Sequence, residues 1–240
     1  MTDLKATMPT AVRRALELLA DPSAEPDISN AYLDLLDAGV PTGTPAAEMF
    51  YASAIGSRVY ANMAPLMHRL FTFQPPMEWL NIPADVVALD VGCGPAGSPR
   101  PLPARCGAKR TRLGRRHLRG DACPRGAGRS GPQLGFLRVD AKRLPLNDET
   151  VDVVTSVAVL LLVPDPAVAL GEMARVLRTG GRLAVLVPTR WWANRFRQVP
   201  NRGLHLFGQD EVGDILENHR FASVRTTTVG THQWVRGKRG

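Results

Sequence analysis

The sequence is poor in cysteine, with only three among its 240 residues. A small, odd number argues against a disulfide framework and is typical of a reducing compartment. The first residues lack the apolar core of a signal peptide, and no run approaches the roughly 20 apolar residues of a membrane span. We therefore expect a cytoplasmic protein without a membrane span.

Patterns for metal binding and for hydrolysis are also missing. Cys106, Cys123 and His117 lie near one another in the sequence, but their spacing matches no zinc motif. We find no internal repeat, no Ser–His–Asp arrangement and no paired carboxylates. The sequence therefore predicts no metal site.

An apolar run that breaks into glycines stands out at residues 86–97, VVALDVGCGPAG. Its first four residues predict a strand buried on both faces, as in parallel sheets. Asp90 follows at the carboxyl end of that strand, where open α/β sheets bind ligands. Gly92 and Gly94 then allow a tight turn in which backbone N–H groups approach a ligand closely. We interpret this segment as a nucleotide-type cofactor loop.

Two kinds of cofactor suit such a loop. Gly92, Gly94 and Gly97 satisfy the dinucleotide fingerprint G-x-G-x-x-G, but a single match is weak. A carboxylate just before the first glycine is not needed for a pyrophosphate, and here Asp90 stands two residues before it. This pattern resembles the D-x-G-x-G-x-G loop of class I S-adenosylmethionine-dependent methyltransferases. A carboxylate there suits a cofactor that carries a sulfonium and an amino group.

Further strands alternate with a helix downstream. Residues 134–140 and 151–157 each predict a strand, and the first of them ends in an acid. Apolar residues at helical spacing predict a helix over 166–177, which the glycines of 179–181 would end. Residues 182–188 predict another strand. Strands alternating with helices indicate a parallel, doubly wound α/β sheet.

The order of these segments also resembles the same family. The stretches VDAKRLPLNDETVDVVTS and LVPDPAVALGEMARVLRTGGRLAVLVPT follow each other as in its small-molecule branch, which includes ubiquinone and menaquinone biosynthesis enzymes. The resemblance covers residues 85–97 and 133–237. It implies a mostly parallel Rossmann-like methyltransferase sheet, S-adenosylmethionine as cofactor and methyl transfer to a small molecule.

The resemblance also implies which residues hold the cofactor, all near the ends of predicted strands: Asp90, Gly92, Cys93, Gly94, Asp140, Ala141 and Ser156. The glycine loop would hold the methionine portion. Asp140 would face the adenine amino group with Ala141 beside it, and Ser156 would line the pocket.

The sequence departs from the family pattern in two places. Ala96 stands where the third glycine belongs, although Gly97 follows at once. The acid that ends the second strand and binds the ribose has no equivalent, because Asp121, the nearest acid, has no predicted strand before it. These departures put cofactor binding in doubt. A methyltransferase-like chain with impaired or absent cofactor binding is therefore the alternative.

Residues 98–131 are anomalous in composition. They contain ten Lys or Arg, one Asp, four Pro and six Gly, but no Val, Ile, Phe, Tyr, Trp or Met. So few large apolar residues predict disorder where the fold requires two helices and a strand. We hypothesise a disturbed reading frame. With one permitted choice of codons, a one-base shift turns the sequence from Arg115 onward into VDISEAML, and a shift in the other direction can turn residues 98–106 into VTAPLARAV. A native Arg-rich arm is the competing interpretation.

The charge of the chain follows from this segment. The net charge is +8, and residues 98–131 alone carry +9. Outside them the sequence shows no basic stripe with interleaved aromatic residues. Nucleic acid is therefore not the expected partner, and an RNA-binding methyltransferase that uses the Arg-rich segment is the weaker alternative.

Residues 1–80 predict a helical N-terminal cap, and residues 81–240 predict the methyltransferase-like domain. Helical spacing is present over 10–20 and continues over 28–36. The apolar and aromatic residues of 46–73 have two interpretations, closure over a pocket or simple packing against the sheet.

The C-terminal part predicts elements that complete the sheet. Residues 210–219 predict an amphipathic helix, and residues 221–229 and 231–235 predict a hairpin across Gly230. His205 precedes that helix, and we expect it, of the five histidines, to face the substrate pocket as a candidate catalytic residue.

Overall fold

The computed structural model describes residues 10–21, 33–35, 76–81, 86–92, 111–115, 134–190 and 204–240. Cys93, Gly94 and the cap residues 46–73 lie outside this part of the chain. The described helices are α2 (Thr10–Glu17), α5 (Met77–Leu80), α6 (Pro166–Val176) and α8 (Glu211–Asn218), with a 3₁₀ turn, η1, at Leu160–Leu162. The strands are β1 (Leu33–Asp34), β2 (Val87–Val91), β3 (Thr111–Arg115), β4 (Leu134–Arg138), β5 (Val151–Val157), β6 (Leu177–Pro188), β7 (Phe221–Val229) and β8 (His232–Arg239).

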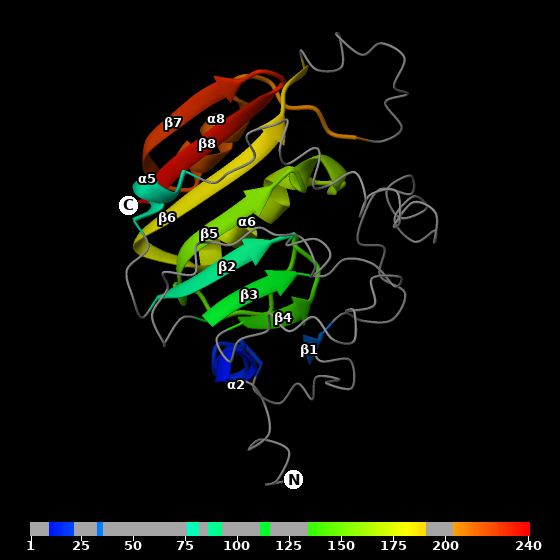
Figure 1. The fold of residues 1–240 in the computed structure, drawn as a ribbon, viewed down its shortest axis with the longest axis vertical. Helices are drawn as coiled ribbons and strands as arrows, with labels where there is room; N and C mark the ends of the chain where they lie inside the picture. Colours follow the sequence, from blue (N-terminus) through cyan, green and yellow to red (C-terminus); the bar gives the residue numbers. More distant parts are fainter. Residues whose placement is uncertain are drawn as a thin grey trace, which may run out of the picture.

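The described strands form one sheet in the order β1-β4-β3-β2-β5-β6-β8-β7 (Figure 1). All pairs from β1 to β6 are parallel, and only β8 runs antiparallel, to β6 and to β7. This confirms the mostly parallel, doubly wound α/β sheet. The strand order reverses between β2 and β5, which makes the carboxyl ends of these two strands the switch point where such sheets bind ligands.

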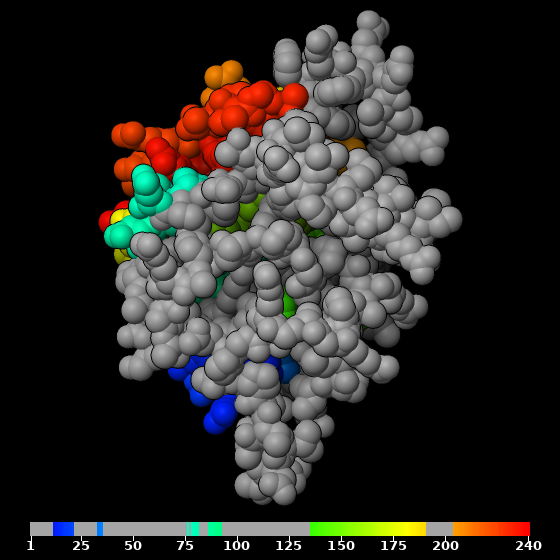
Figure 2. Space-filling model, in the orientation of Figure 1, coloured from blue at the N-terminus to red at the C-terminus, as the bar shows by residue number. Residues whose placement is uncertain are grey.

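Side chains alternate between the two faces of the sheet. One set, including Leu89, Val154 and Val185, joins the larger core beneath α6 and α8. The other set, including Ala88 and Val153, packs in a smaller cluster with α5. In Figure 2, α5 and the β7–β8 hairpin lie side by side at the surface of this second face.

The apolar runs form their predicted elements with small shifts of boundary. The predicted strand at 151–157 is β5, and the one at 134–140 is β4 with its last two residues outside the strand. The helix predicted over 166–177 is α6, which ends one residue earlier. The predicted C-terminal hairpin is formed by β7 and β8 around Gly230, which has a φ of +60°.

Three local expectations were wrong. Composition predicted no strand within 98–131, yet β3 pairs in parallel with β2 and β4, because its backbone bonds on both sides do not depend on apolar side chains. Residues 179–181 do not end a helix. They lie inside β6, which already pairs at Leu177 and shifts register before Arg182, with Gly180 at a φ of +79°. The helical pattern over 28–36 is interrupted by β1, which pairs with β4.

The N-terminal residues belong to the same core. Val12, Ala15 and Leu19 of the α2 region are buried in the larger cluster, and Figure 1 shows α2 beside the β4 and β1 edge of the sheet. Among the described residues, no helix is long and apolar enough to cross a membrane.

Candidate functional site

The carboxyl end of β2 presents a buried acid. Asp90 is 9% exposed, and its Oδ1 accepts a hydrogen bond of 2.7 Å from the Thr155 hydroxyl on β5. The two residues are direct partners in the parallel register, which brings their side chains to the same face. A buried carboxylate requires such partners. Thr155 therefore orients Asp90 at the switch point of the sheet.

The turn after β2 requires glycine. Gly92 has a φ of +82°, a conformation that L side chains rarely adopt. A Cβ at Gly92 would lie 2.1 Å from Cγ2 of Val159, which follows β5. The Gly92 backbone therefore lies closer to Val159 than any residue with a Cβ could lie at position 92. The Val159 side chain fills this face of the turn.

Asp140 follows β4 at the same end of the sheet. Its Oδ1 accepts a hydrogen bond of 2.9 Å from the Lys142 backbone N–H, and its carbonyl accepts one of 3.1 Å from Arg143. The Lys142 ammonium lies 4.0 Å from Oδ2. Ala141, in the turn, is completely buried. The carboxylate is thus held by its own turn, with one oxygen beside a cation.

Ser156 lies on the opposite face of β5 from Thr155. Its side chain is completely buried, and its Oγ has no hydrogen-bond partner. Because side chains alternate along a strand, Ser156 faces the same side as Val154, toward the larger core. The neighbouring Thr155, which the sequence did not single out, is the residue that contacts Asp90. The register of β2 against β5 was the signal needed to find it.

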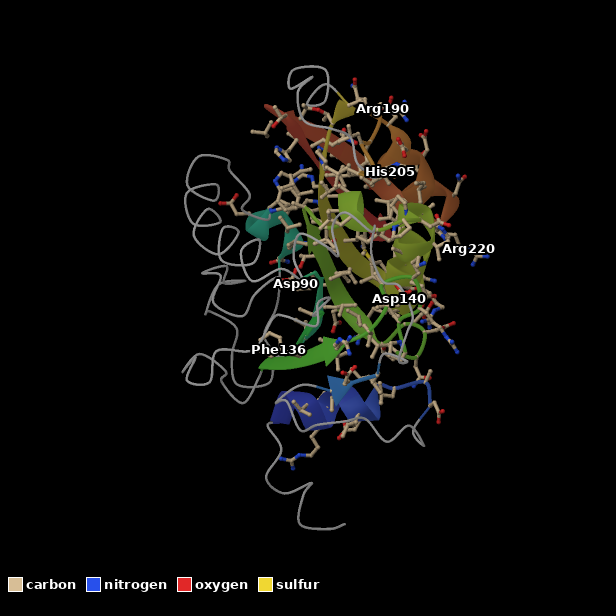
Figure 3. All side chains as sticks on the ribbon, turned by 90° about the vertical axis from the view of Figure 1, so that its right-hand side faces the viewer. Asp90, Phe136, Asp140, Arg190, His205 and Arg220 are labelled. Atoms are coloured by element: carbon tan, nitrogen blue, oxygen red, sulfur yellow. The ribbon has the colours of Figure 1, made fainter. Side chains whose placement is uncertain are left out.

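His205 lies at the end of the sheet near β6. Its backbone N–H donates to the carbonyl of Leu161 in η1 at 2.9 Å. Its Nε2 lies 2.6 Å from Glu211 Oε1, and its ring packs at 4.5 Å against Phe207. Figure 3 shows Asp90 on the side of the sheet away from α6 and α8, and Asp140 and His205 on the side of these helices.

Glu211 is an ionised partner for His205. Burial raises the pKa of its carboxyl, but the Gly208 N–H at 2.8 Å, the His205 ring and the Arg190 guanidinium together hold that pKa below its usual value. Arg190 contacts the second carboxylate oxygen at 3.4 Å. With Glu211 ionised, Nε2 of His205 carries the proton, and the lone pair of the neutral ring is on Nδ1.

Residues 89–185 match the family described as a methyltransferase domain. This segment begins in β2, ends in β6 and contains Asp90, Asp140 and Ser156. Over this segment the chain is similar to methyltransferase domains.

Curated proteins that the chain resembles are methyltransferases. The chain is 32% identical to the 2-phytyl-1,4-naphtoquinone methyltransferase of Thermosynechococcus vestitus over 142 residues, which are 53% of this chain and 62% of that enzyme. Another curated methyltransferase relative is covered for 38% of its length. The chain therefore spans between about two fifths and three fifths of these relatives.

Solved structures share the fold at low identity. A putative methyltransferase of Haloferax volcanii, solved in complex with the Trm112 methyltransferase activator, has a TM-score of 0.62 at 17% identity over 80% of this chain and 97% of that chain. The magnesium protoporphyrin IX methyltransferase of Synechocystis PCC 6803, solved with bound S-adenosylhomocysteine, has a TM-score of 0.53 at 15% identity over 80% and 92% of the two chains.

Proposed function

We propose that this methyltransferase binds S-adenosylmethionine across the carboxyl edge of the sheet and transfers its methyl group to a small molecule. The observation that carries the proposal is the buried Asp90, oriented by Thr155 beside the strict glycine turn at Gly92. Asp140 lies beyond the end of β4, two strands away from β2, or about 10 Å across the sheet. One nucleoside with an amino-acid tail can reach both acids.

The residues present fit this cofactor. Asp90 is an acceptor for the ammonium of the methionine portion, and a charge-assisted hydrogen bond of this kind is strong in a buried site. Asp140 is an acceptor for the adenine amino group, with Ala141 beside it. The bound cofactor supplies a methyl group already activated by the sulfonium.

The chain itself contributes position and proton handling. Asp90 and Asp140 fix the two ends of the cofactor, so that alignment with the acceptor atom does most of the work. We propose that His205 accepts the acceptor's proton at Nδ1, because Glu211 holds the other ring nitrogen at 2.6 Å. Glu211 then stabilises the imidazolium that forms.

The acceptor is proposed to be a small, apolar molecule. A relative named for a naphthoquinone substrate supports this class, although the match covers only part of that enzyme. The proposed setting is the cytoplasm, on the basis of the low, odd cysteine count.

Calorimetric titration with S-adenosylhomocysteine tests the proposal. We expect micromolar binding by the wild-type chain. Asp90→Asn keeps an acceptor for Thr155 but removes the charge, and loss of a charged hydrogen bond costs about 1.5–3 kcal/mol, or roughly tenfold or more in affinity. Asp210→Asn is the matched control, because this exposed acid makes no side-chain capping bond. Absence of heat with the wild type, or equal affinity in D90N, contradicts the proposal.

A further inference from the structure

Arg175 and Glu172 on α6 form an ion pair with unusually many bonds. Arg175 Nε donates to Glu172 Oε1 at 2.7 Å and Nη2 donates to Oε2 at 2.8 Å, a bidentate arrangement. Nη1 also reaches Asp148 Oδ1 at 2.6 Å. The hydrogen bond to Glu172 outweighs burial and raises the pKa of the guanidinium. The Arg175 guanidinium is therefore held in place by two carboxylates.

The pair is bonded to the loop that follows Asp140. Glu172 Oε2 accepts the Leu144 backbone N–H at 2.7 Å, and Arg175 Nη2 donates to the Leu144 carbonyl at 2.7 Å. Both backbone polar groups of Leu144 thus belong to this one ion pair. Arg175 Nη1 also donates to the Leu146 carbonyl at 2.8 Å.

Leu144 is connected to Asp140 by a short, bonded turn. The Arg143 N–H donates to the Asp140 carbonyl, and the Lys142 N–H donates to its carboxylate. A displacement of Leu144 is therefore transmitted to the orientation of the Asp140 carboxylate. The same loop is also bonded to the residues that follow α2: the Ala20 N–H donates to the Pro145 carbonyl, and the Asn147 N–H donates to the Leu18 carbonyl.

An ion pair that only stabilised α6 would not need these contacts. Arg14 and Glu17 of α2 have a comparable three-residue separation and a 2.7 Å bond, but their side chains are more than half exposed. Exposed pairs of this kind contribute little to stability. The Arg175–Glu172 pair instead directs its remaining donors and acceptor to a single loop, to the backbone of Leu144 and Leu146 and to the Asp148 carboxylate.

We propose that Glu172 and Arg175 are positioning residues for the cofactor, which hold the Asp140 turn so that its carboxylate meets the adenine amino group. This inference rests on the proposed function. It assigns a role in cofactor specificity to two residues of α6, a helix that the proposed function does not place against the cofactor.

Ligand discrimination tests this role in the full chain. S-inosylhomocysteine carries an oxygen in place of the adenine amino group of S-adenosylhomocysteine. Calorimetry gives the ratio of the two dissociation constants for the wild type, for Glu172→Gln and for Arg175→Lys. We expect the wild type to prefer the adenine ligand about tenfold or more, and both variants to lose most of that preference.

The matched controls are Glu17→Gln and Arg14→Lys, which make the same two substitutions in an exposed pair and should keep the wild-type ratio. Urea unfolding identifies any variant that fails to fold. If Arg175→Lys fails to fold, the milder Glu172→Gln alone provides the test. Unchanged affinities, or a parallel loss for both ligands at a constant ratio, overturn the inference. Absence of S-adenosylhomocysteine binding by the wild type overturns the proposed function and the inference with it.

Discussion

Substitution of Gly92 by alanine tests the geometry of the turn after β2. The new Cβ would lie 2.1 Å from Val159 Cγ2 and 2.6 Å from Cγ1, at a φ of +82°. The left-handed backbone costs an L residue about 1–2 kcal/mol, and overpacking costs about 1–3 kcal/mol more. We expect Gly92→Ala to lower the free energy of unfolding by about 2–5 kcal/mol, measured by urea denaturation.

Two further variants separate these contributions. Gly230→Ala places alanine at a φ of +60° where no atom lies within 4 Å of the new Cβ, so it isolates the backbone cost of about 1–2 kcal/mol. Val159→Ala removes the two closest contacts of the new Cβ, those with Cγ2 and Cγ1, and leaves only the residue 159 Cβ at 2.8 Å. Combined with Gly92→Ala, it should therefore recover part of the overpacking cost of about 1–3 kcal/mol as a coupling energy. If Gly92→Ala costs no more than Gly230→Ala, or if the Val159 change recovers nothing, the described packing of the turn is wrong.

Three other predictions concern catalysis, pH and the gene. His205→Gln should lower kcat by about 10²–10⁴-fold while the affinity for S-adenosylhomocysteine is kept, and Glu211→Gln should lower kcat less. An equal kcat in the wild type and both variants would show that His205 takes no part in the chemistry. Burial lowers the pKa of His232 from 6.5, so the unfolded chain binds more protons than the folded one. The free energy of unfolding should therefore fall as the pH drops below about 6.5, and it should fall less in His232→Gln. A free energy of unfolding that rises toward acid pH contradicts this. The nucleotide sequence for residues 98–131 should encode VDISEAML and VTAPLARAV in its shifted frames. If it encodes neither, the hypothesis of a disturbed reading frame is wrong.

Strongly apolar segments were predictable from the sequence because burial on both faces leaves a continuous run. The strand β5 is of this kind, and Asp90 was singled out because it ends another such run. The helix α6 was predictable from the helical spacing of its apolar residues. His205 was singled out from its place before an amphipathic helix, and its role at a substrate pocket stays a prediction.

Features that depend on neighbouring strands were not predictable. The pairing of β3 depends on β2 and β4, which its own composition does not reveal. The role of Thr155 depends on its register against Asp90, and the bulge around Gly180 depends on pairing at Leu177. The hydrogen bonds from Arg175 to the Leu144 and Leu146 carbonyls join groups about 30 residues apart in the chain, and the helical periodicity of α6 does not predict them.

A crystal structure of the chain grown with S-adenosylhomocysteine would test the central claim most directly. The account predicts density across the carboxyl edge of the sheet, with the amino-acid end at Asp90 and the adenine at Asp140 and Ala141. Ligand density at any other place, or a crystal soaked at saturating ligand with none at this edge, would contradict it.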